Sequence, residues 1–569
     1  MSTARASLVE RALSAPPHDH GVHIDGGARA SWSELVARAQ RRVPQLRAAG
    51  VGPGDRVLLT LPTSLSFVEA LLATWLAGAV PVPLPAPQGA RAGAIAARIA
   101  HVARIARPRA VLHPAGEPVD LEGQDVPAIT FDESAAASGT TANPTAGPHT
   151  SSHTPHHAAP HRIVLEGTAF IQFTSGSTGD PRGVVVTHTA LQAQLEQLHA
   201  GMGVREGDSA VSWLPLFHDM GLVGGLLLPF AYGLDVTLLS PLAFLLRPAR
   251  WLQAISRSRG TMTAAPSSAY ALCAARVRDQ ELHGLDLSCW RVALDGAEAV
   301  RAEAMDAFAA RMAPVGFSPS AFMPAYGLAE STLAVCMASR GHGARVRSVD
   351  AALLAAGELK ELPAGSAGAV RVVSSGTPVP GARVRVVDEA GASLPEGRVG
   401  LLRVSSPSLG AGYFNDPAAS AAAFRDGELD TGDLGALVDG ELFVTGRVKD
   451  TLVVRGRKIG AEDVEAAVEQ ALRRDAHHRP PVALAFGVPA AAVDGERVVV
   501  LVGMHGKATL EPERHERALA AAREAAGAHD VVVVVVAASS LPRTTSGKLR
   551  RFEARSLWQR DALVPGLPA

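Results

Sequence analysis

A glycine-rich segment between two apolar runs places the tightest constraint on how this chain can fold. The segment TSGSTGDPRG, residues 174–183, follows AFIQF and precedes VVVTH, which predicts two strands joined by a turn. Glycines and small hydroxyl side chains allow backbone N–H groups to wrap a polyphosphate closely. The segment lacks the Gly-Lys-Ser/Thr ending of a Walker loop, and a predicted strand rather than a helix follows it. Taken alone, it is equally typical of a Gly/Ser-rich hairpin turn.

The apolar pattern elsewhere predicts an α/β protein with several lobes. A chain of 569 residues is longer than one hydrophobic core accommodates. Alternating strands and amphipathic helices fill residues 32–112 and 163–375, and short alternating strands fill residues 376–444. A small α+β block begins at about residue 449. There AEDVEAAVEQAL is predicted as a helix, with VALAFGV, RVVVLVG and DVVVVVVA as buried strands.

We therefore expect a large N-terminal domain of two α/β subdomains plus a β-rich subdomain, followed by a small α+β domain. Within the large domain, residues 135–161 consist mainly of Ala, Ser, Thr, Gly, Pro and His. Such a segment buries too little apolar surface to order itself, so a flexible surface loop is predicted. Its histidines have no Cys or acidic partner, and a metal site there is not expected.

Composition and charge exclude several classes of function. Lys and Arg total 54 against 55 Asp and Glu, so no global positive field attracts nucleic acid or an anionic membrane. The three cysteines, Cys273, Cys289 and Cys336, share no CxxC spacing, which fits a reducing compartment. The most apolar stretch, residues 221–234, is short and broken by Gly and Pro. We expect a cytoplasmic protein without nucleic-acid partners and without integral membrane association.

Four further motifs follow the glycine-rich segment in order. They are AYGLAEST at 325–332, LDTGDLG at 429–435, GRVKD at 446–450 and PRTTSGKLRR at 542–551. The order and spacing of the five motifs resemble the superfamily of adenylate-forming enzymes, which includes acyl-CoA synthetases and the adenylation domains of peptide synthetases. The resemblance covers most of the chain. It implies an N-terminal adenylation domain over residues 1–448 and a mobile C-terminal domain over 449–569, with Lys449 at the hinge.

The resemblance also implies an ATP site assembled from these motifs. Asp433 would bind the ribose hydroxyls with the help of Arg447, and Tyr326 would stack on adenine. The residues implied to bind ATP are Thr174, Ser175, Gly176, Ser177, Thr178, Gly179, Gly296, Ala297, Tyr326, Gly327, Asp433 and Arg447. Outside its motif, Tyr326 would be interpreted as an ordinary core aromatic residue.

The chemistry of adenylation explains two further residues that the resemblance implies. Joining a carboxylate to the α-phosphate of ATP forces two anions together in a site of low dielectric. Glu330 would hold a Mg²⁺ ion that bridges phosphate oxygens, and Lys548 would sit between the carboxylate and the α-phosphate. In isolation, Glu330 would be a helix-start carboxylate and Lys548 a solvated loop lysine. ATP and Mg²⁺ are the expected cofactors.

The segments between the motifs resemble one branch, the fatty acyl-AMP ligases, more closely than the CoA ligases. These segments are residues 212–225, 238–256, 263–273 and 285–300. The span from Ser331 to Ser375 also resembles the insertion that distinguishes this branch, and packing of this span against the small domain would restrain the swing of that domain. Asp295 stands where the branch usually has Asn. Because of this departure from the branch pattern, the sequence does not specify the length of the acyl chain or the partner.

An apolar cluster is expected to hold the acyl chain, because an alkyl chain gains about 0.8 kcal/mol per buried CH2. The expected acyl-pocket residues are Phe217, His218, Met220, Gly221, Ala265 and Tyr270. Plain core packing is the alternative for many apolar side chains in this stretch. His218 is stronger evidence for a binding site than the apolar side chains are, because a polar side chain within an apolar run needs a partner.

The sequence therefore predicts an enzyme that activates a medium- or long-chain fatty acid to acyl-AMP and releases pyrophosphate. The acyl group would then pass to the phosphopantetheine thiol of an acyl carrier protein, or of a carrier domain in a polyketide or peptide synthase. An acyl-CoA synthetase is the nearest alternative. A catalytically silent protein that binds nucleotide or acyl groups is a third hypothesis, which the presence of Glu330, Asp433 and Lys548 disfavours.

Overall fold

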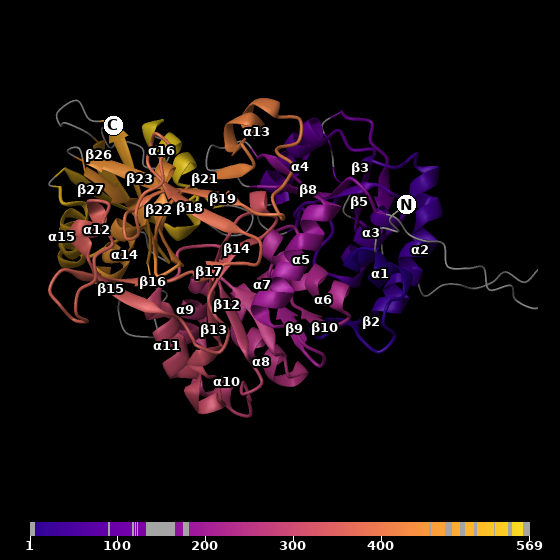
Figure 1. Ribbon diagram of the computed structural model, residues 1–569, viewed down its shortest axis with the longest axis horizontal. Coiled ribbons are helices and arrows are strands. Elements are labelled where there is room, and N and C mark those ends of the chain that lie inside the picture. The colour runs from indigo at the N-terminus through magenta and orange to yellow at the C-terminus, as the bar shows by residue number, and fades with distance from the viewer. Residues whose placement is uncertain are drawn as a thin grey trace, which may run out of the picture.

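The computed structural model describes residues 6–88, 92–116, 119, 121, 123–131, 165–174, 181–454, 457–472, 481–489, 496–505, 509–528, 530–543 and 549–560. The loop predicted at 135–161 lies outside these residues. The fold is mixed α/β, with a large N-terminal domain and a smaller C-terminal domain, as expected from the sequence. In Figure 1 the small domain lies beside the β-rich subdomain, at the opposite end of the molecule from the indigo N-terminal elements.

A nine-stranded sheet forms the centre of the large domain. In spatial order its strands are β17 (Thr377–Pro378), β14 (Ala334–Met337), β13 (Phe322–Gly327), β12 (Val292–Asp295), β11 (Met262–Ala265), β9 (Ser209–Ser212), β10 (Asp235–Leu238), β1 (Gly21–Ile24) and β2 (Arg29–Ser31). The strands from β13 to β1 run parallel. Their carboxyl ends therefore meet at one edge, where open α/β sheets bind ligands.

Helices from distant parts of the chain share one apolar core with this sheet. They include α1 (Leu8–Ser14), α5 (His188–Met202), α6 (Leu228–Tyr232), α7 (Pro241–Leu246), α8 (Ala249–Ser258), α9 (Ser267–Arg276), α10 (Asp279–Leu282) and α11 (Ala302–Met312). Strand β1 pairs with β10 so that Val22 lies opposite Val236. The N-terminal strand thus belongs to the sheet of the second α/β block. The local sequence pattern does not predict this long-range pairing.

A smaller parallel sheet confirms the alternation predicted for residues 32–112. Its order is β4 (Val80–Pro83), β3 (Arg56–Leu59), β5 (Ala110–His113) and β6 (Ala128–Thr130). The helices of this region are α2 (Trp32–Ala48), α3 (Leu65–Leu76) and α4 (Ala92–Ala106). Helix α2 starts at a capping box, in which the Ser31 hydroxyl accepts from the Glu34 N–H and the Glu34 carboxylate accepts from the Ser31 N–H.

The two strands predicted on either side of the glycine-rich segment are also confirmed. Strands β7 (Thr168–Phe173) and β8 (Gly183–Thr187) pair antiparallel, with Phe173 opposite Gly183. Helix α5 begins only after β8, at His188. The segment therefore joins two strands instead of opening a helix as a Walker loop does.

The β-rich region is an antiparallel sheet followed along the chain by the small domain. Its strands are β18 (Arg383–Val387), β19 (Gly400–Ser405), β21 (Glu428–Val438), β20 (Phe424–Arg425) and β22 (Glu441–Arg447), with helix α13 (Pro417–Ala423) beside β20 and β21. Within the span 331–375, strands β15 (Val346–Asp350) and β16 (Ala369–Val373) form a hairpin that contains helix α12 (Ala351–Ala355). Arg371 of this hairpin pairs with Asp306 of α11 at 2.7 Å.

The small domain packs two apolar layers on the two faces of one sheet. Strands β25 (Val482–Pro489), β26 (Glu496–Met504) and β27 (Val531–Ala537) form the sheet, and β23 (Thr451–Val454) pairs with β24 (Arg457–Gly460). Helices α14 (Ala461–Leu472) and α15 (Pro512–Ala526) pack on one face, and α16 (Arg551–Gln559) on the other. Val464, Val468 and Leu472 are fully buried, which confirms the predicted face of α14.

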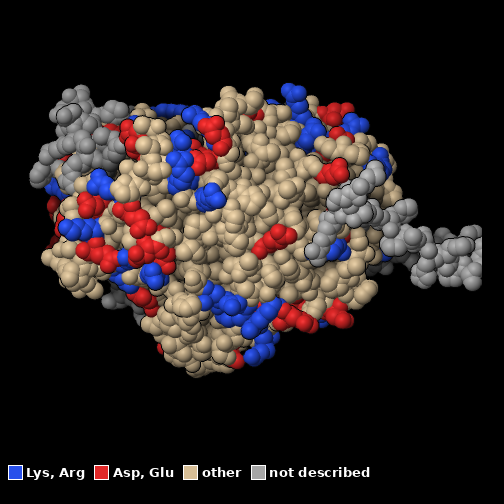
Figure 2. All heavy atoms as spheres, in the orientation of Figure 1, with Lys and Arg blue, Asp and Glu red and all other residues tan. Residues whose placement is uncertain are grey.

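Positive and negative side chains are interspersed on the face shown in Figure 2, and its centre is largely uncharged. This distribution fits the near-zero net charge and gives no single-sign surface on that face. In the part of the chain that the structure describes, no helix has both the length and the apolarity required to cross a membrane.

Candidate active site

A cavity of about 670 Å³ opens at the carboxyl edge of the large sheet and extends to the start of the small domain. Thr174, Phe217, His218, Met220, Gly296, Ala297, Tyr326, Gly327, Glu330, Arg447 and Lys449 all line it, and all were expected at the site from the sequence. Ser175, Gly176, Ser177, Thr178, Gly179 and Lys548 lie outside the described residues. Their roles stay predictions.

Close backbone packing requires glycine at two positions of the cavity lining. Gly327 ends β13, and a Cβ at this position would lie 1.9 Å from the carbonyl oxygen of Leu333. At Gly296, directly after β12, a Cβ would lie 2.9 Å from the carbonyl oxygen of Ala325. Ala297 adopts a left-handed backbone conformation with φ of 69°. Bare backbone of this kind permits the close approach of a flat ring.

A three-residue polar cluster lies where hairpin β21–β22 meets β13. The Tyr326 hydroxyl donates to Asp433 Oδ2 at 2.7 Å, and Arg447 Nε lies 2.6 Å from Asp433 Oδ1. Asp433 itself is buried behind the cavity wall, whereas Tyr326 and Arg447 line it. Burial and the Asp433 carboxylate raise the pKa of Tyr326, so its hydroxyl remains a hydrogen-bond donor.

Glu330 lies on the short 3₁₀ turn Ala329–Ser331, and its carboxylate points to a tyrosine that sequence reasoning missed. The Tyr413 hydroxyl donates to Glu330 Oε1 at 2.9 Å, and the Arg182 guanidinium lies over the Tyr413 ring, 5.3 Å from its centroid. Burial raises the pKa of Glu330. The next residue after the turn, Thr332, has a φ of 66°, and its hydroxyl donates to the Ser408 carbonyl at 2.6 Å.

The donor chemistry at Glu330 fits Mg²⁺. A carboxylate oxygen is a hard ligand, and protein sites commonly supply Mg²⁺ with only one or two carboxylates while phosphates and water complete the shell. Among the described residues, no cluster of three or more His, Cys, Asp or Glu side chains could hold a metal. Phosphate oxygens would therefore have to provide much of the coordination.

The segment between the two domains is fixed at both ends. Arg447 pairs with Asp433 of the large domain, while Arg551 Nη1 of the small domain lies 2.8 Å from Asp450 Oδ1. Arg551 also contacts Glu465 of α14 at 2.8 Å. Only Val448 and Lys449 lie between these anchored residues, on the 3₁₀ turn Val448–Asp450. This turn contains the predicted hinge.

The arm of the cavity that was expected to hold the acyl chain is built around a π-helix, Met220–Leu227, with Gly224 and Gly225 on its cavity face. π-helical turns are rare and occur frequently at functional sites. At its start, His218 Nδ1 lies 2.5 Å from Asp219 Oδ1, so the predicted partner of His218 is its neighbour. The preceding carbonyl, that of Phe217, accepts from Gln172 Nε2 at 2.6 Å.

Three residues expected in the acyl pocket, Gly221, Ala265 and Tyr270, do not line the cavity. Tyr270 is fully buried, donates to the Leu294 carbonyl at 3.0 Å and packs among aromatic rings, including Trp251. Its apolar ring gains more from that core than from the cavity wall. Ala265 is buried at the end of β11, and a Cβ on Gly221 would lie 2.2 Å from the Pro215 carbonyl oxygen.

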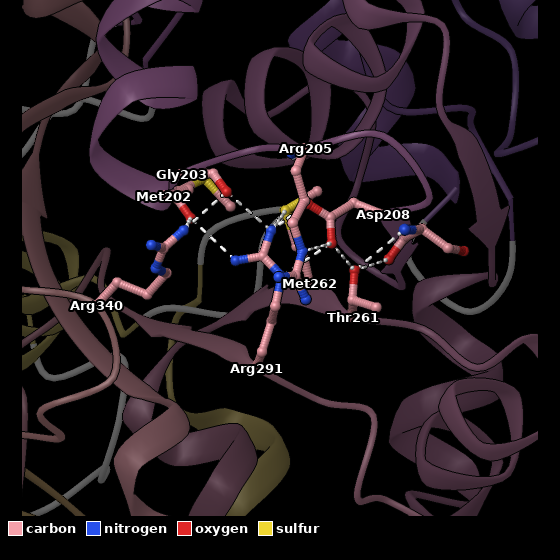
Figure 3. A network of polar contacts seen from close by, with 9 residues as sticks. Met202, Gly203, Arg205, Asp208, Thr261, Met262, Arg291 and Arg340 are labelled. Atoms are coloured by element: carbon pink, nitrogen blue, oxygen red, sulfur yellow. Dashed lines mark hydrogen bonds and ion pairs between the residues drawn. The ribbon is translucent and has the colours of Figure 1, made fainter.

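Leu228, which belongs to the apolar run expected to hold the acyl chain, also lines this arm. Further apolar lining residues were not predicted from the sequence, and they are Leu198, Met202, Ala210, Val211, Pro229 and Met262. The C-terminus of α5, which carries Met202, is held by arginines (Figure 3). Arg291 donates to the carbonyls of Met202 and Gly203 and pairs with Asp208, and Arg340 donates to Gly203 at 2.9 Å.

A family model described as AMP-binding enzyme matches residues 9–414. The chain belongs to this family of adenylate-forming ligases, which confirms the resemblance seen in the five motifs and makes ATP the expected nucleotide. The match covers the nine-stranded sheet and most of the cavity lining, Glu330 included, and ends before Arg447 and Lys449.

Two relatives and one solved structure are similar over nearly the whole chain. A Caulobacter vibrioides protein named as an acyl-CoA synthetase is 36% identical over 92% of this chain and 89% of its own length. The medium-chain-fatty-acid–[acyl-carrier-protein] ligase JamA of Moorena producens is 33% identical over 92% and 89%. A structure from a study of fatty acyl-adenylate ligases from E. coli and L. pneumophila is 33% identical, covers 98% of both chains and has a TM-score of 0.85.

Proposed function

We propose that this enzyme joins a medium- or long-chain fatty acid to the α-phosphate of ATP and then transfers the acyl group to the pantetheine thiol of a carrier protein. The observation that carries the proposal is one continuous cavity with two unlike ends. Tyr326, Arg447 and Glu330 supply polar and charged groups at one end, and Met202 and Met262 supply apolar surface at the other. Such a cavity suits a molecule that is a nucleotide at one end and an alkyl chain at the other.

In the first half-reaction a carboxylate oxygen of the fatty acid attacks the α-phosphorus, and the bond to the β-phosphate oxygen breaks to release pyrophosphate. Glu330 would hold Mg²⁺, which supplies charge neutralisation at the phosphate oxygens when bound. Tyr326 and Arg447 fix the Asp433 carboxylate beside the expected ribose position. Lys548 is proposed to neutralise the attacking carboxylate, because two anions otherwise repel at close range.

The span 331–375 supports a carrier protein rather than free CoA as acceptor. Its helix α12 contacts β24 of the small domain, while Arg371 anchors the same hairpin to α11. A second link, Arg301 Nη1 to Glu469 Oε2 at 3.4 Å, joins α11 to α14. These contacts would restrain the swing of the small domain about Lys449. The likeness to JamA, whose name specifies an acyl-carrier-protein ligase, also supports a carrier protein as the acceptor.

We further propose that the domains divide at residues 448/449 and that the protein works in the cytoplasm. The first proposal is supported by the separate apolar cores on the two sides of that boundary. The second is supported by the free thiols of Cys273, Cys289 and Cys336, because cytosolic proteins rarely form disulfides.

Mass spectrometry of reactions with ATP, Mg²⁺ and saturated fatty acids tests the proposal. Acyl-AMP should accumulate, free CoA should yield little acyl-CoA, and a holo carrier protein should become acylated. Efficient acyl-CoA formation would support the acyl-CoA synthetase, the activity that the name of the Caulobacter relative specifies. Binding of ATP without any acyl-AMP would instead support a catalytically silent protein.

A matched pair of lysine variants tests the catalytic assignment within the same assay. Lys548→Ala should reduce acyl-AMP formation by roughly a thousandfold while ATP binding changes little, because the lysine acts on the attacking carboxylate. Lys360→Ala, at an exposed position in the span 331–375, should retain activity. Equal activity of the two variants would remove Lys548 from the mechanism.

A further inference from the structure

One arm of the cavity contains a guanidinium group without an anionic partner among the described residues. Arg98 on α4 lines the cavity together with Thr174 and Arg182. Its Nη2 donates a long hydrogen bond of 3.4 Å to the Thr174 carbonyl, and its buried Nε has no acceptor within the described part of the chain. A desolvated cation is unfavourable unless an anion offsets its charge. The empty arm therefore has the electrostatic character of an anion site.

A second cation approaches Arg98 from the other domain. Burial lowers the pKa of Arg98, and the nearby charge of Arg550, which precedes α16 of the small domain, lowers it further. Arg550 pairs with Glu553 one turn along, so its own charge is partly offset. The neighbouring Arg182 is 4.0 Å from the Asp416 carboxylate and stacks on Tyr413. Of the three arginines, Arg98 alone has no described acidic partner.

The position of Arg98 indicates which anion it binds. Its contact, Thr174, begins the glycine-rich segment, and the Thr174 N–H donates to the Arg182 carbonyl at 2.9 Å across the base of that segment. The cavity continues from this arm past Glu330 to Tyr326, where the proposed nucleotide begins. An anion here would lie at the far end of a phosphate chain. Guanidinium groups match phosphate oxygens with forked hydrogen bonds.

We propose that Arg98 binds the β- and γ-phosphates of ATP and the pyrophosphate product. The proposal rests on the proposed function and adds to it a residue that holds the terminal phosphates. While the polyphosphate is present, it offsets the charge of Arg98 and supplies an acceptor for its buried Nε.

Binding measurements on the full chain test the ligand role without any fatty acid. Pyrophosphate, α,β-methylene-ATP and AMP are titrated by calorimetry into wild type, Arg98→Ala, Arg98→Lys and Arg104→Ala. Arg104 is an exposed arginine on the same helix and serves as the matched control. Arg98→Ala should bind pyrophosphate and α,β-methylene-ATP about tenfold more weakly or worse and bind AMP within about twofold of wild type. Arg98→Lys should be intermediate, because it keeps the charge and loses the fork.

Unchanged pyrophosphate affinity in Arg98→Ala would overturn the proposal, and so would an equal loss for AMP, which would indicate a general structural defect. Unfolding temperatures matching those of Arg104→Ala exclude misfolding as the cause. If wild type binds pyrophosphate through Arg98 but activates no fatty acid, the proposed function fails and the phosphate site stands.

Discussion

The two ends of the cavity differ in how they would recognise their parts of the substrate. At the proposed nucleotide end, buried and half-buried side chains already contact one another in fixed pairs, such as Tyr326 with Asp433 and Tyr413 with Glu330. At the acyl end, Met202, Leu228 and Met262 offer apolar area and no directional partner. Removing one member of a buried polar pair leaves the other unsatisfied, whereas apolar area contributes in small increments. We therefore expect abrupt effects of substitution at the first end and graded effects at the second.

The largest effect is expected at Glu330. Glu330→Gln removes the only charge with which this side chain can hold Mg²⁺, and kcat for acyl-AMP formation should fall by roughly 10²- to 10³-fold, with partial rescue at higher Mg²⁺. Because burial raises the pKa of Glu330, the wild-type rate should decline toward acidic pH as the carboxylate is protonated. Steady-state rates across pH check both points. An acidic limb that persists in Glu330→Gln would assign it to another group, and Glu396→Gln at an exposed position should behave as wild type.

A smaller but still abrupt effect is expected at Asp433. Asp433→Asn takes the buried counter-charge from Arg447, and the KM for ATP should rise about 10- to 100-fold. Tyr326→Phe loses only the hydroxyl that donates to Asp433, so its KM should rise less. Initial rates at varied ATP concentration measure both. Equal KM values for the two variants and wild type would show that this cluster is structural only.

The acyl end should respond gradually. In wild type, kcat/KM should increase roughly tenfold for every two methylenes until the apolar arm is filled, at about 0.8 kcal/mol per CH2. Met202→Ala removes side-chain volume from the arm and should move the optimum to longer acids by a few carbons. Met504→Ala makes the same chemical change in the small domain, where Met504 packs against the apolar core, and should leave the optimum unchanged. A flat chain-length response in wild type would contradict an apolar arm for the acyl chain.

The smallest effect concerns stability and not catalysis. Burial raises the pKa of Asp295 far above the ordinary carboxyl value, and the Ser267 hydroxyl donates to it at 2.7 Å. The native state therefore binds a proton that the unfolded chain releases above about pH 4. The contribution of Asp295 to the free energy of unfolding is consequently lost as the pH rises toward the folded-state pKa. Asp295→Asn should remain stable to higher pH than wild type. Denaturant unfolding of the large domain at several pH values measures this, with exposed Asp426→Asn as control, and parallel curves for all three proteins would refute it.

The sequence predicted residues that act through local backbone patterns and missed those brought in by long-range packing. Gly327, Glu330 and Arg447 belong to short motifs at turns next to strand ends, so their patterns mark their positions. Tyr413 and Arg98 reach the cavity from the β-rich subdomain and from the first α/β subdomain, and no local pattern marks either. Tyr270 was predicted in the acyl pocket and lies in the aromatic core instead. Helical spacing places Tyr270 on an apolar face, but it does not specify whether that face contacts the cavity or the core.

The pairing of Arg447 with one domain and of Asp450 with the other leaves a connection of only two residues. Each residue has two freely rotating backbone torsions, so Val448 and Lys449 together contribute four. A body attached through so few torsions turns about a nearly fixed point and does not drift away as it would on a long linker. In the proposed swing, every residue of the small domain would follow an arc whose radius is its distance from the turn. Such a connection would exchange one face of that domain for another at the cavity without letting the domain diffuse away between half-reactions.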